Sequence, residues 1–188
     1  MKIRSLALVL ALFAPFATSA DRAQAAAAKS KNAFQADFIS QLDATEKKIV
    51  SLEEAVPQDK LTWRPAPGVR SISEVYLHLA YGNYGLLKLA TGKESPADAG
   101  FDSNAPKWEA QTTDKAAIKK ILEASFDNIR TVVKGLSDAD LEKKVSFFGT
   151  EMTARQALMV LIEHQHEHLG QSIAYARMNK IVPPWSKG

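Results

Sequence analysis

Four histidines carry most of the chemistry that this 188-residue sequence can offer. On an α-helix each residue advances by about 100°, so His164 and His168 lie about 40° apart on one helical face, whereas His166 lies about 200° from His164. Two neutral imidazoles at this spacing can direct their nitrogens at one divalent metal ion. We therefore predict that His164 and His168 are metal ligands. His166, which stands between Glu163 and Glu167, is expected to face solvent.

A third imidazole, that of His78, also points toward the predicted interior. His78 shares one helical stripe with Gly82 and Leu86, and an inward imidazole is costly unless it is hydrogen-bonded or bound to a metal. A lone inward histidine is more often a hydrogen-bonded core residue, and an isolated His-x-x-x-His pair is only moderately specific. The two features in one small domain predict that His78, His164 and His168 together bind one divalent ion.

Three protein ligands leave a coordination position for water or substrate, which is typical of catalytic rather than structural zinc sites. The sequence has no cysteine, so a cysteine-ligated zinc site and a thiol nucleophile are both excluded. We expect zinc, nickel or iron, because imidazole suits all three and the residues do not choose between them. Gln171 lies one turn beyond His168. It could orient a bound ligand or hydrogen-bond a histidine's second nitrogen, and both roles stay open.

The histidines need rigid elements to position them, and the hydrophobic periodicity indicates four. Apolar residues recur every three or four positions in four segments, the pattern of amphipathic helices. The second and fourth segments begin with capping boxes, Ser71 to Glu74 and Thr153 to Gln156, which satisfy free backbone donors. We expect an all-α, up-down-type four-helix bundle over residues 32–188. The predicted helices cover residues 34–52, 71–90, 115–135 and 153–179.

Two connections, residues 53–70 and 92–112, are long for a simple bundle, and a short extended piece at 145–147 precedes the fourth helix. Loops of such length are often functional or mobile. We expect segment 92–112 to form a flap over the metal site, with Phe101 or Trp108 lining a pocket. The alternative is a disordered insertion that makes no contact with the site. Other aromatic residues could line the same pocket or belong to the core: Trp63, Tyr81 and Tyr84.

Residues 1–20 have the features of a cleavable signal peptide. Two basic residues precede an apolar run over residues 6–16, and small residues follow it. This run is shorter than the ~20 residues that a membrane-spanning helix needs, which disfavours an uncleaved anchor. We predict cleavage after Ala20, or alternatively after Ala25, and then a flexible leader over residues 21–31. The mature protein is expected to be periplasmic or secreted.

The charge of the mature chain argues against one class of partner. The full sequence has a formal net charge of +3, and removal of the two basic residues of the signal peptide leaves it nearly neutral, with no basic run. Electrostatics therefore give no reason to expect nucleic acid as a partner. We expect no membrane association after cleavage and a small-molecule ligand or substrate. A homodimer remains one option for the assembly.

Two blocks of the sequence resemble the DinB-like/YfiT-like superfamily of metal-binding four-helix bundles. The order and spacing match the family pattern over essentially the whole mature chain, and the resemblance implies a metal triad of His78, His164 and His168. The chain departs from the family at Leu169, where members commonly have arginine, and at Glu167, where they often have histidine. The first block comprises Leu61-Thr62-Trp63-Arg64-Pro65-Ala66-Pro67-Gly68, Ser71-Ile72-Ser73-Glu74 and His78-Leu79. The second comprises His164, His168-Leu169-Gly170-Gln171, Tyr175-Ala176-Arg177 and Pro183-Pro184.

The resemblance also implies a class of activity. Characterised members of this superfamily include thiol-dependent S-transferases and isomerases that act with bacillithiol or mycothiol, and predicted hydrolases. Both chemistries can use a metal ion to lower the pKa of a bound thiol or water. Because export separates a protein from cytosolic thiols, we expect a hydrolase that uses metal-activated water rather than a thiol transferase. A non-catalytic envelope binding module and a purely structural metal site remain as alternatives.

Overall fold

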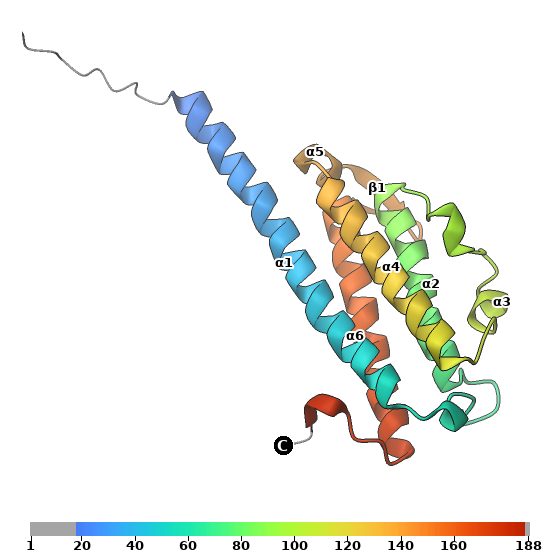
Figure 1. Cartoon of the computed structure of the whole chain (residues 1–188). Helices are drawn as coiled ribbons and strands as arrows, with labels where there is room; N and C mark the ends of the chain where they lie inside the picture. Colours follow the sequence, from blue (N-terminus) through green and yellow to red (C-terminus); the bar gives the residue numbers. More distant parts are fainter. Residues whose placement is uncertain (1–17, 187–188) are drawn as a thin grey trace, which may run out of the picture.

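The computed structural model describes residues 18–186, over which four long helices pack side by side (Figure 1). They are α1 (Ser19–Ala55), α2 (Ile72–Thr91), α4 (Lys115–Gly135) and α6 (Ala154–Met178). The shorter elements are η1 (Gln58–Lys60), η2 (Ala97–Ala99), α3 (Ala105–Glu109), α5 (Asp138–Leu141), β1 (Lys144–Phe147), β2 (Thr150–Thr153) and η3 (Pro184–Ser186). The predicted four-helix bundle is confirmed, and the structure adds a small β-hairpin.

Local sequence explains where the two histidine-bearing helices begin. The side chain of Ser71 accepts a hydrogen bond from the backbone nitrogen of Glu74, and the Glu74 carboxylate accepts one from the Ser71 backbone at 2.6 Å. Thr153 and Gln156 form the equivalent capping box at the start of α6. Each box satisfies backbone donors that the first turn leaves free. Apolar side chains from the four helices fill one continuous core, among them Leu42, Leu79, Phe126 and Leu161.

The helices do not follow the up-down order that we expected. Gln35 in α1 donates to the carbonyl oxygen of Val133 at the end of α4, and Lys115 at the start of α4 donates to that of Glu54 at the end of α1. α1 and α4 are therefore antiparallel, whereas α2 and α4 run in the same direction (Figure 1). Two parallel neighbours need a connection that returns along the bundle, and this explains why the 92–114 connection is long.

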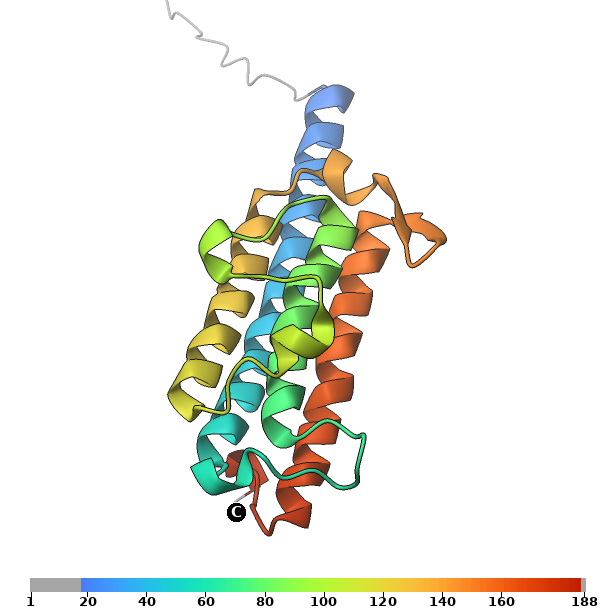
Figure 2. The same cartoon turned by 90° about the vertical axis from the view of Figure 1, so that its right-hand side faces the viewer.

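The 92–114 connection crosses the outer face of α2 (Figure 2). Trp108 is only 4% exposed, and its indole nitrogen donates to the carbonyl oxygen of Gly100 at 3.3 Å. The ring of Phe101 lies 5.1 Å from that of Tyr81, and the Tyr81 hydroxyl donates to the carbonyl oxygen of Ser103 at 3.0 Å. The connection is thus ordered and packed against α2, so the alternative of a disordered insertion is wrong.

The extended piece expected at 145–147 is one strand of an antiparallel hairpin. β1 pairs with β2 in a register that sets Phe147 opposite Thr150. Phe148 and Gly149 form the two-residue turn, and both have positive φ values, 50° and 81°. Because only four residues form each strand, the period-two pattern in the sequence was too short to indicate the second one.

The structure continues α1 back to Ser19, through residues 21–31, which we expected as a flexible leader. The alanines at 25–28 explain this difference, because alanine has the highest intrinsic helix propensity. Residues 1–17 of the predicted signal peptide lie outside the described residues.

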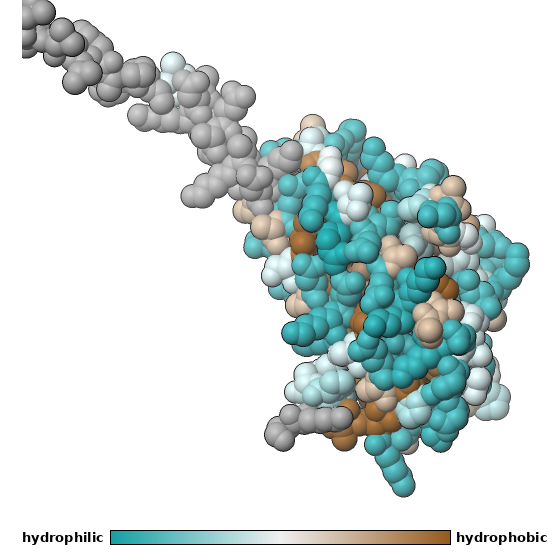
Figure 3. Space-filling view, viewed as in Figure 1, coloured by the Kyte–Doolittle hydropathy of each residue, from teal (hydrophilic) through white to brown (hydrophobic). Residues whose placement is uncertain are grey.

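The side of the bundle formed by α1 and α4 is mostly hydrophilic, with apolar atoms limited to small patches (Figure 3). Within residues 18–186, no helix combines the length and the apolar character needed to cross a membrane.

Candidate metal centre

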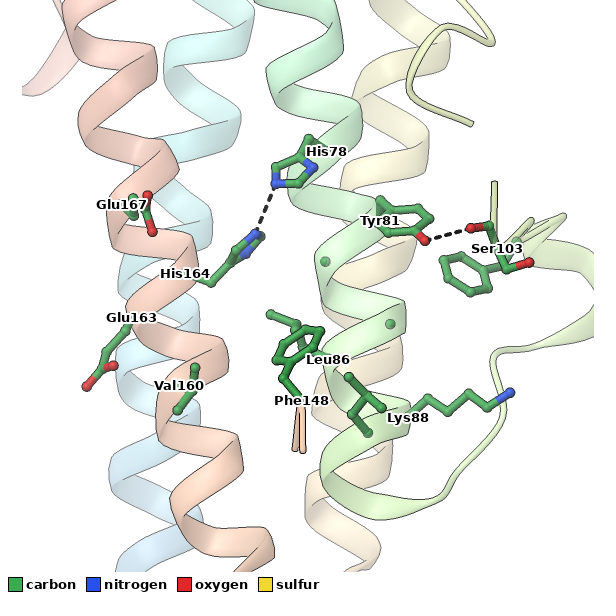
Figure 4. A pocket seen from close by; sticks show the side chains of 14 residues that line it. His78, Tyr81, Leu86, Lys88, Ser103, Phe148, Val160, Glu163, His164 and Glu167 are labelled. Atoms are coloured by element: carbon green, nitrogen blue, oxygen red, sulfur yellow. Dashed lines mark hydrogen bonds between the residues drawn. The ribbon is translucent and has the colours of Figure 1, made fainter. Parts of the chain in front are cut away.

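The three histidines predicted as ligands converge from two neighbouring helices. His78 comes from α2, and His164 and His168 come from α6. Their candidate ligand nitrogens all lie within 4.8 Å of one another. Nε2 of His164 is 3.2 Å from Nε2 of His78, and these two nitrogen atoms point toward each other across the gap between the helices (Figure 4). The ring of His168 lies 4.5 Å from each of the other two.

A carboxylate from the 92–114 connection orients the imidazole of His78. Nδ1 of His78 donates to Oε1 of Glu109 at 2.6 Å, and Glu109, at the end of α3, is 6% exposed. Arg70 donates two hydrogen bonds to the same carboxylate, at 2.6 and 3.1 Å. An ionised carboxylate only accepts, so His78 carries its proton on Nδ1 and turns the lone pair of Nε2 toward the other histidines.

Gln171 plays the same part for His168. Nδ1 of His168 donates to Oε1 of Gln171 at 2.8 Å, and the Gln171 amide nitrogen donates to the hydroxyl of Tyr175 at 3.0 Å. Of the two roles that the sequence left open, the structure therefore places Gln171 as the partner of a histidine's second nitrogen. The lone pair of His168 Nε2 is left free to bind a metal.

Gly82 provides the space that His164 occupies. A Cβ atom on Gly82 would lie 2.3 Å from Cε1 of His164 and 2.9 Å from its Nδ1. These distances are far inside van der Waals contact, so any side chain at this position would displace the imidazole. The glycine on the His78 stripe of α2 is therefore part of the site.

Burial favours the neutral imidazoles that metals bind. Burial, together with the charges that His168 and His78 acquire when protonated, lowers the pKa of His164 to about 3. Burial also lowers the pKa of His78, against the opposing effect of the Glu109 hydrogen bond. Both rings are therefore neutral at pH 7, with a lone pair available for a cation.

The donor set fits a divalent ion. Two nitrogens that share one tetrahedral ion, each about 2.0–2.1 Å from it, are about 3.3 Å apart, and the two Nε2 atoms of His78 and His164 are 3.2 Å apart. Nδ1 of His164 is buried and has no hydrogen-bond partner among the described residues. Three convergent imidazoles, two of them held by acceptors on their far side, are the arrangement expected of zinc, nickel or iron ligands.

His166 lies apart from the triad, as predicted from its place on the helix. It is an exposed residue, and its Nδ1 lies 2.9 Å from the carbonyl oxygen of Ile162. Its Nε2 lies 3.3 Å from the hydroxyl of Thr45 in α1, on the side away from His78. Glu163 and Glu167 are also exposed, but both line the cavity described next.

A cavity of about 600 Å³ lies beside His78 and His164, between α2, α6, the 92–114 connection and the hairpin turn (Figure 4). Tyr81 and Phe101 line this cavity, as the sequence suggested for both. The other aromatic candidates are elsewhere: Trp63 packs edge-on against Tyr175, and Tyr84 and Trp108 are buried in the core. The 92–114 connection thus forms one wall of the cavity.

The sequence did not indicate Glu109 as a partner of the histidines. One feature of the sequence does point to a fixed position for Glu109. Asn104 and Pro106 mark the start of a short helix, and Glu109 directly follows Trp108, so a buried aromatic residue anchors the carboxylate. The sequence does not indicate that the 92–114 connection crosses α2, and this path is what brings Glu109 to His78.

A family model and solved structures place the chain among known proteins. The family model described as the DinB superfamily matches residues 41–172, which include all three histidines. No curated protein matches the chain in sequence.

Solved structures share the fold at low sequence identity. A DinB-like protein from Bacillus cereus superposes with a TM-score of 0.67 at 20% identity, covering 78% of this chain and 93% of that one. YfiT from Bacillus subtilis, described as a probable metal-dependent hydrolase with an unusual four-helix bundle topology, gives 0.62 at 18%, covering 78% and 88%. A mycothiol-dependent maleylpyruvate isomerase gives 0.59 at 14%, covering 72% and 59%. At these identities the likeness shows the fold.

Proposed function

This chain belongs to the DinB superfamily, and we propose that it is an exported metal-dependent hydrolase of a small molecule. Its one divalent ion, zinc, nickel or iron, is held by His78, His164 and His168. The observation that supports this proposal is the convergence of three neutral imidazoles on a point that borders an open cavity.

An ion held by three imidazoles keeps a position for water or substrate, lowers the pKa of a coordinated water toward neutrality and polarises a substrate carbonyl. The chain's own residues prepare the site. Glu109 and Gln171 hold the protons of His78 and His168 on Nδ1, which directs the Nε2 lone pairs inward. Arg70 fixes the Glu109 carboxylate by two hydrogen bonds.

Two carboxylates among the cavity-lining residues are the candidates to accept a proton from water during hydrolysis. Glu163 and Glu167 line the cavity beside His164, and neither has an ion-pair partner among the described residues. Glu109 is not available for this role, because its carboxylate is occupied by His78 and Arg70. Proton transfer from water to a positioned carboxylate is a common form of general base catalysis.

The function is tested with mature protein that has been stripped by a chelator and reloaded with zinc, nickel or iron(II). We expect hydrolysis of 4-nitrophenyl acetate by the reloaded protein, loss of turnover with the stripped protein, and no turnover with His168→Ala. His166→Ala is the matched control and should retain the wild-type rate. A rate that is the same with and without metal would contradict the proposal.

The same assay separates the other chemistries. Turnover that requires an added low-molecular-weight thiol would favour S-transfer, the activity class suggested by the mycothiol-dependent structural neighbour. Stoichiometric metal without turnover of any ester or thiol substrate would favour a binding module or a structural site. Export is tested by N-terminal sequencing of the mature protein, which we expect to begin near Asp21 or Ala26.

A further inference from the structure

The cavity beside the triad has walls of unlike chemistry. At one end are the imidazoles of His78 and His164, and the rest is largely apolar (Figure 4). Gly82 and Gly85 form a floor without side chains on α2, and a Cβ atom on Gly85 would still be 3.8 Å from the nearest atom, in the ring of Phe101. Its volume is within the range of small-molecule pockets. The apolar lining residues are Leu86, Leu89, Phe101, Phe148 and Val160.

The charges around this cavity disfavour an anionic substrate tail. Lys88 is the one cation among the lining residues, and its ammonium is 2.9 Å from the carboxylate of Glu94. Arg64 and Arg70 line a different pocket, where they pair with Glu74 and Glu109. Carboxylates from Glu163 and Glu167 add negative charge at the rim of the cavity. A phosphate or carboxylate remote from the reacting group would therefore meet no unpaired cation there.

Phe148 stands at the mouth of the cavity in a conformation that its residue type disfavours. Its φ is 50°, in the left-handed region, which bulky side chains rarely adopt. In two-residue hairpin turns with two positive φ values, asparagine followed by glycine is the preferred pair. Phe148 is also 76% exposed, so core packing does not explain it. Its ring nevertheless lies among the cavity-lining residues and edge-on to the buried ring of Phe147, 5.0 Å away.

From these observations we propose, building on the proposed hydrolase function, that the cavity receives the uncharged apolar acyl or aryl part of the substrate. Phe148 covers that part from the hairpin turn. The substrate class is then neutral esters with an aliphatic or aromatic acyl group, and not phosphates or sugars. Hydrolysis of such an ester breaks the acyl–oxygen bond and consumes one water, giving a carboxylic acid and an alcohol.

Phe148→Asn provides the sharpest test, because it installs the residue that the turn prefers while it removes the ring. We use metal-loaded mature protein and the uncharged probe N-phenyl-1-naphthylamine, whose fluorescence rises in apolar surroundings. Phe148→Asn should weaken probe binding at least fivefold with no loss of bound metal and no fall in melting temperature. Met159→Asn is the matched control, since Met159 is an exposed apolar residue of α6 that does not line the cavity.

Gly85→Leu tests the floor of the same cavity. The new side chain should fill the space next to Phe101 and reduce probe affinity at least tenfold, whereas Gly85→Ala should change it less than twofold. Unaltered probe affinity in both Phe148→Asn and Gly85→Leu, with metal retained, would overturn the proposal. A change of oligomeric state in Phe148→Asn, measured by light scattering, would also overturn it, because the ring would then serve a contact between copies.

An ester series separates this inference from the function on which it rests. With 4-nitrophenyl acetate, butyrate, hexanoate and octanoate, kcat/KM should rise at least tenfold along the wild-type series and stay nearly flat for Gly85→Leu. Metal-dependent hydrolysis with no dependence on acyl length, and no probe binding, would leave the hydrolase and reject the apolar cavity. Probe binding that Phe148→Asn and Gly85→Leu both weaken, in a protein that hydrolyses no ester, would leave the cavity and reject the hydrolase.

Discussion

Nδ1 of His78 in α2 donates a 2.6 Å hydrogen bond to Oε1 of Glu109 in α3, so a carboxylate from the longest connection of the bundle fixes one of three clustered imidazoles. The same carboxylate is held by Arg70. This pairing makes the 92–114 connection part of the candidate metal site rather than only a cover over it.

Glu109→Gln should weaken metal binding about 10- to 100-fold, the usual effect of removing the partner of a metal-binding histidine. The neutral amide is a poorer acceptor for His78 Nδ1–H, and it also leaves Arg70 without a counter-charge. The measurement is a competition titration with a chromogenic chelator. Glu163→Gln is the control, since Glu163 lines the cavity without an ion-pair partner among the described residues. Equal affinity of Glu109→Gln and wild type would show that His78 does not depend on this hydrogen bond.

Replacement of each histidine by alanine should separate the triad from its neighbour. His78→Ala, His164→Ala and His168→Ala should each remove most of the bound metal, because two imidazoles bind a divalent ion far less tightly than three. His166→Ala should retain it, since the ring of His166 faces Thr45 on α1. Elemental analysis of the four purified variants gives the answer. If His166→Ala loses as much metal as His168→Ala, the assignment by helical face is wrong.

Gly82→Ala should impair metal binding although it adds only one methyl group. The new Cβ would lie 2.3 Å from Cε1 of His164, so the imidazole has to move away from the other two. Gly85→Ala, one turn further along α2, should keep its metal and gain up to about 1 kcal/mol of stability from helix propensity. Metal content and thermal unfolding of both variants test this contrast. Full metal occupancy in Gly82→Ala would mean that His164 is not held where the structure places it.

Residue spacing was sufficient to predict the triad but not its surroundings. His164 and His168 share a face because helix geometry is local, and the periodicity of α2 is enough to turn His78 inward. The approach of Glu109 depends on the path of a whole connection, which no local pattern records. The same holds for the direction of α4, since its amphipathic pattern is the same whether the helix runs parallel or antiparallel to α2. The positive φ of Phe148 was equally hidden, because phenylalanine rarely adopts it.

The last prediction concerns a buried carboxyl group away from the histidines. Glu53, near the end of α1, is 0% exposed, and neither of its carboxylate oxygens has a hydrogen-bond partner among the described residues. Burial raises the pKa of Glu53 from its ordinary value of 4.5 to about 7, and the nearby ammonium groups of Lys115 and Lys119 only partly oppose this effect. The hydroxyl of Tyr76, whose pKa is raised by burial and by Glu53, is also buried.

The unfolded chain releases the Glu53 proton near pH 4.5, whereas the folded protein keeps it until about pH 7. Between these values the folded state holds the Glu53 proton and the unfolded chain does not, so the contribution of Glu53 to the free energy of unfolding should fall as the pH rises through this window and level off above it. Comparison with Glu53→Gln isolates this contribution from that of His164, whose lowered pKa acts in the opposite direction. Glu53→Gln keeps the shape of the neutral acid, so it should remove this slope and stabilise the protein by about 1–3 kcal/mol at pH 8. Urea unfolding at pH 5, 6, 7 and 8 measures both effects, with Glu54→Gln as the exposed control. A wild-type stability that is flat or rising between pH 5 and 7, relative to Glu53→Gln, would show that Glu53 is ionised in the folded protein.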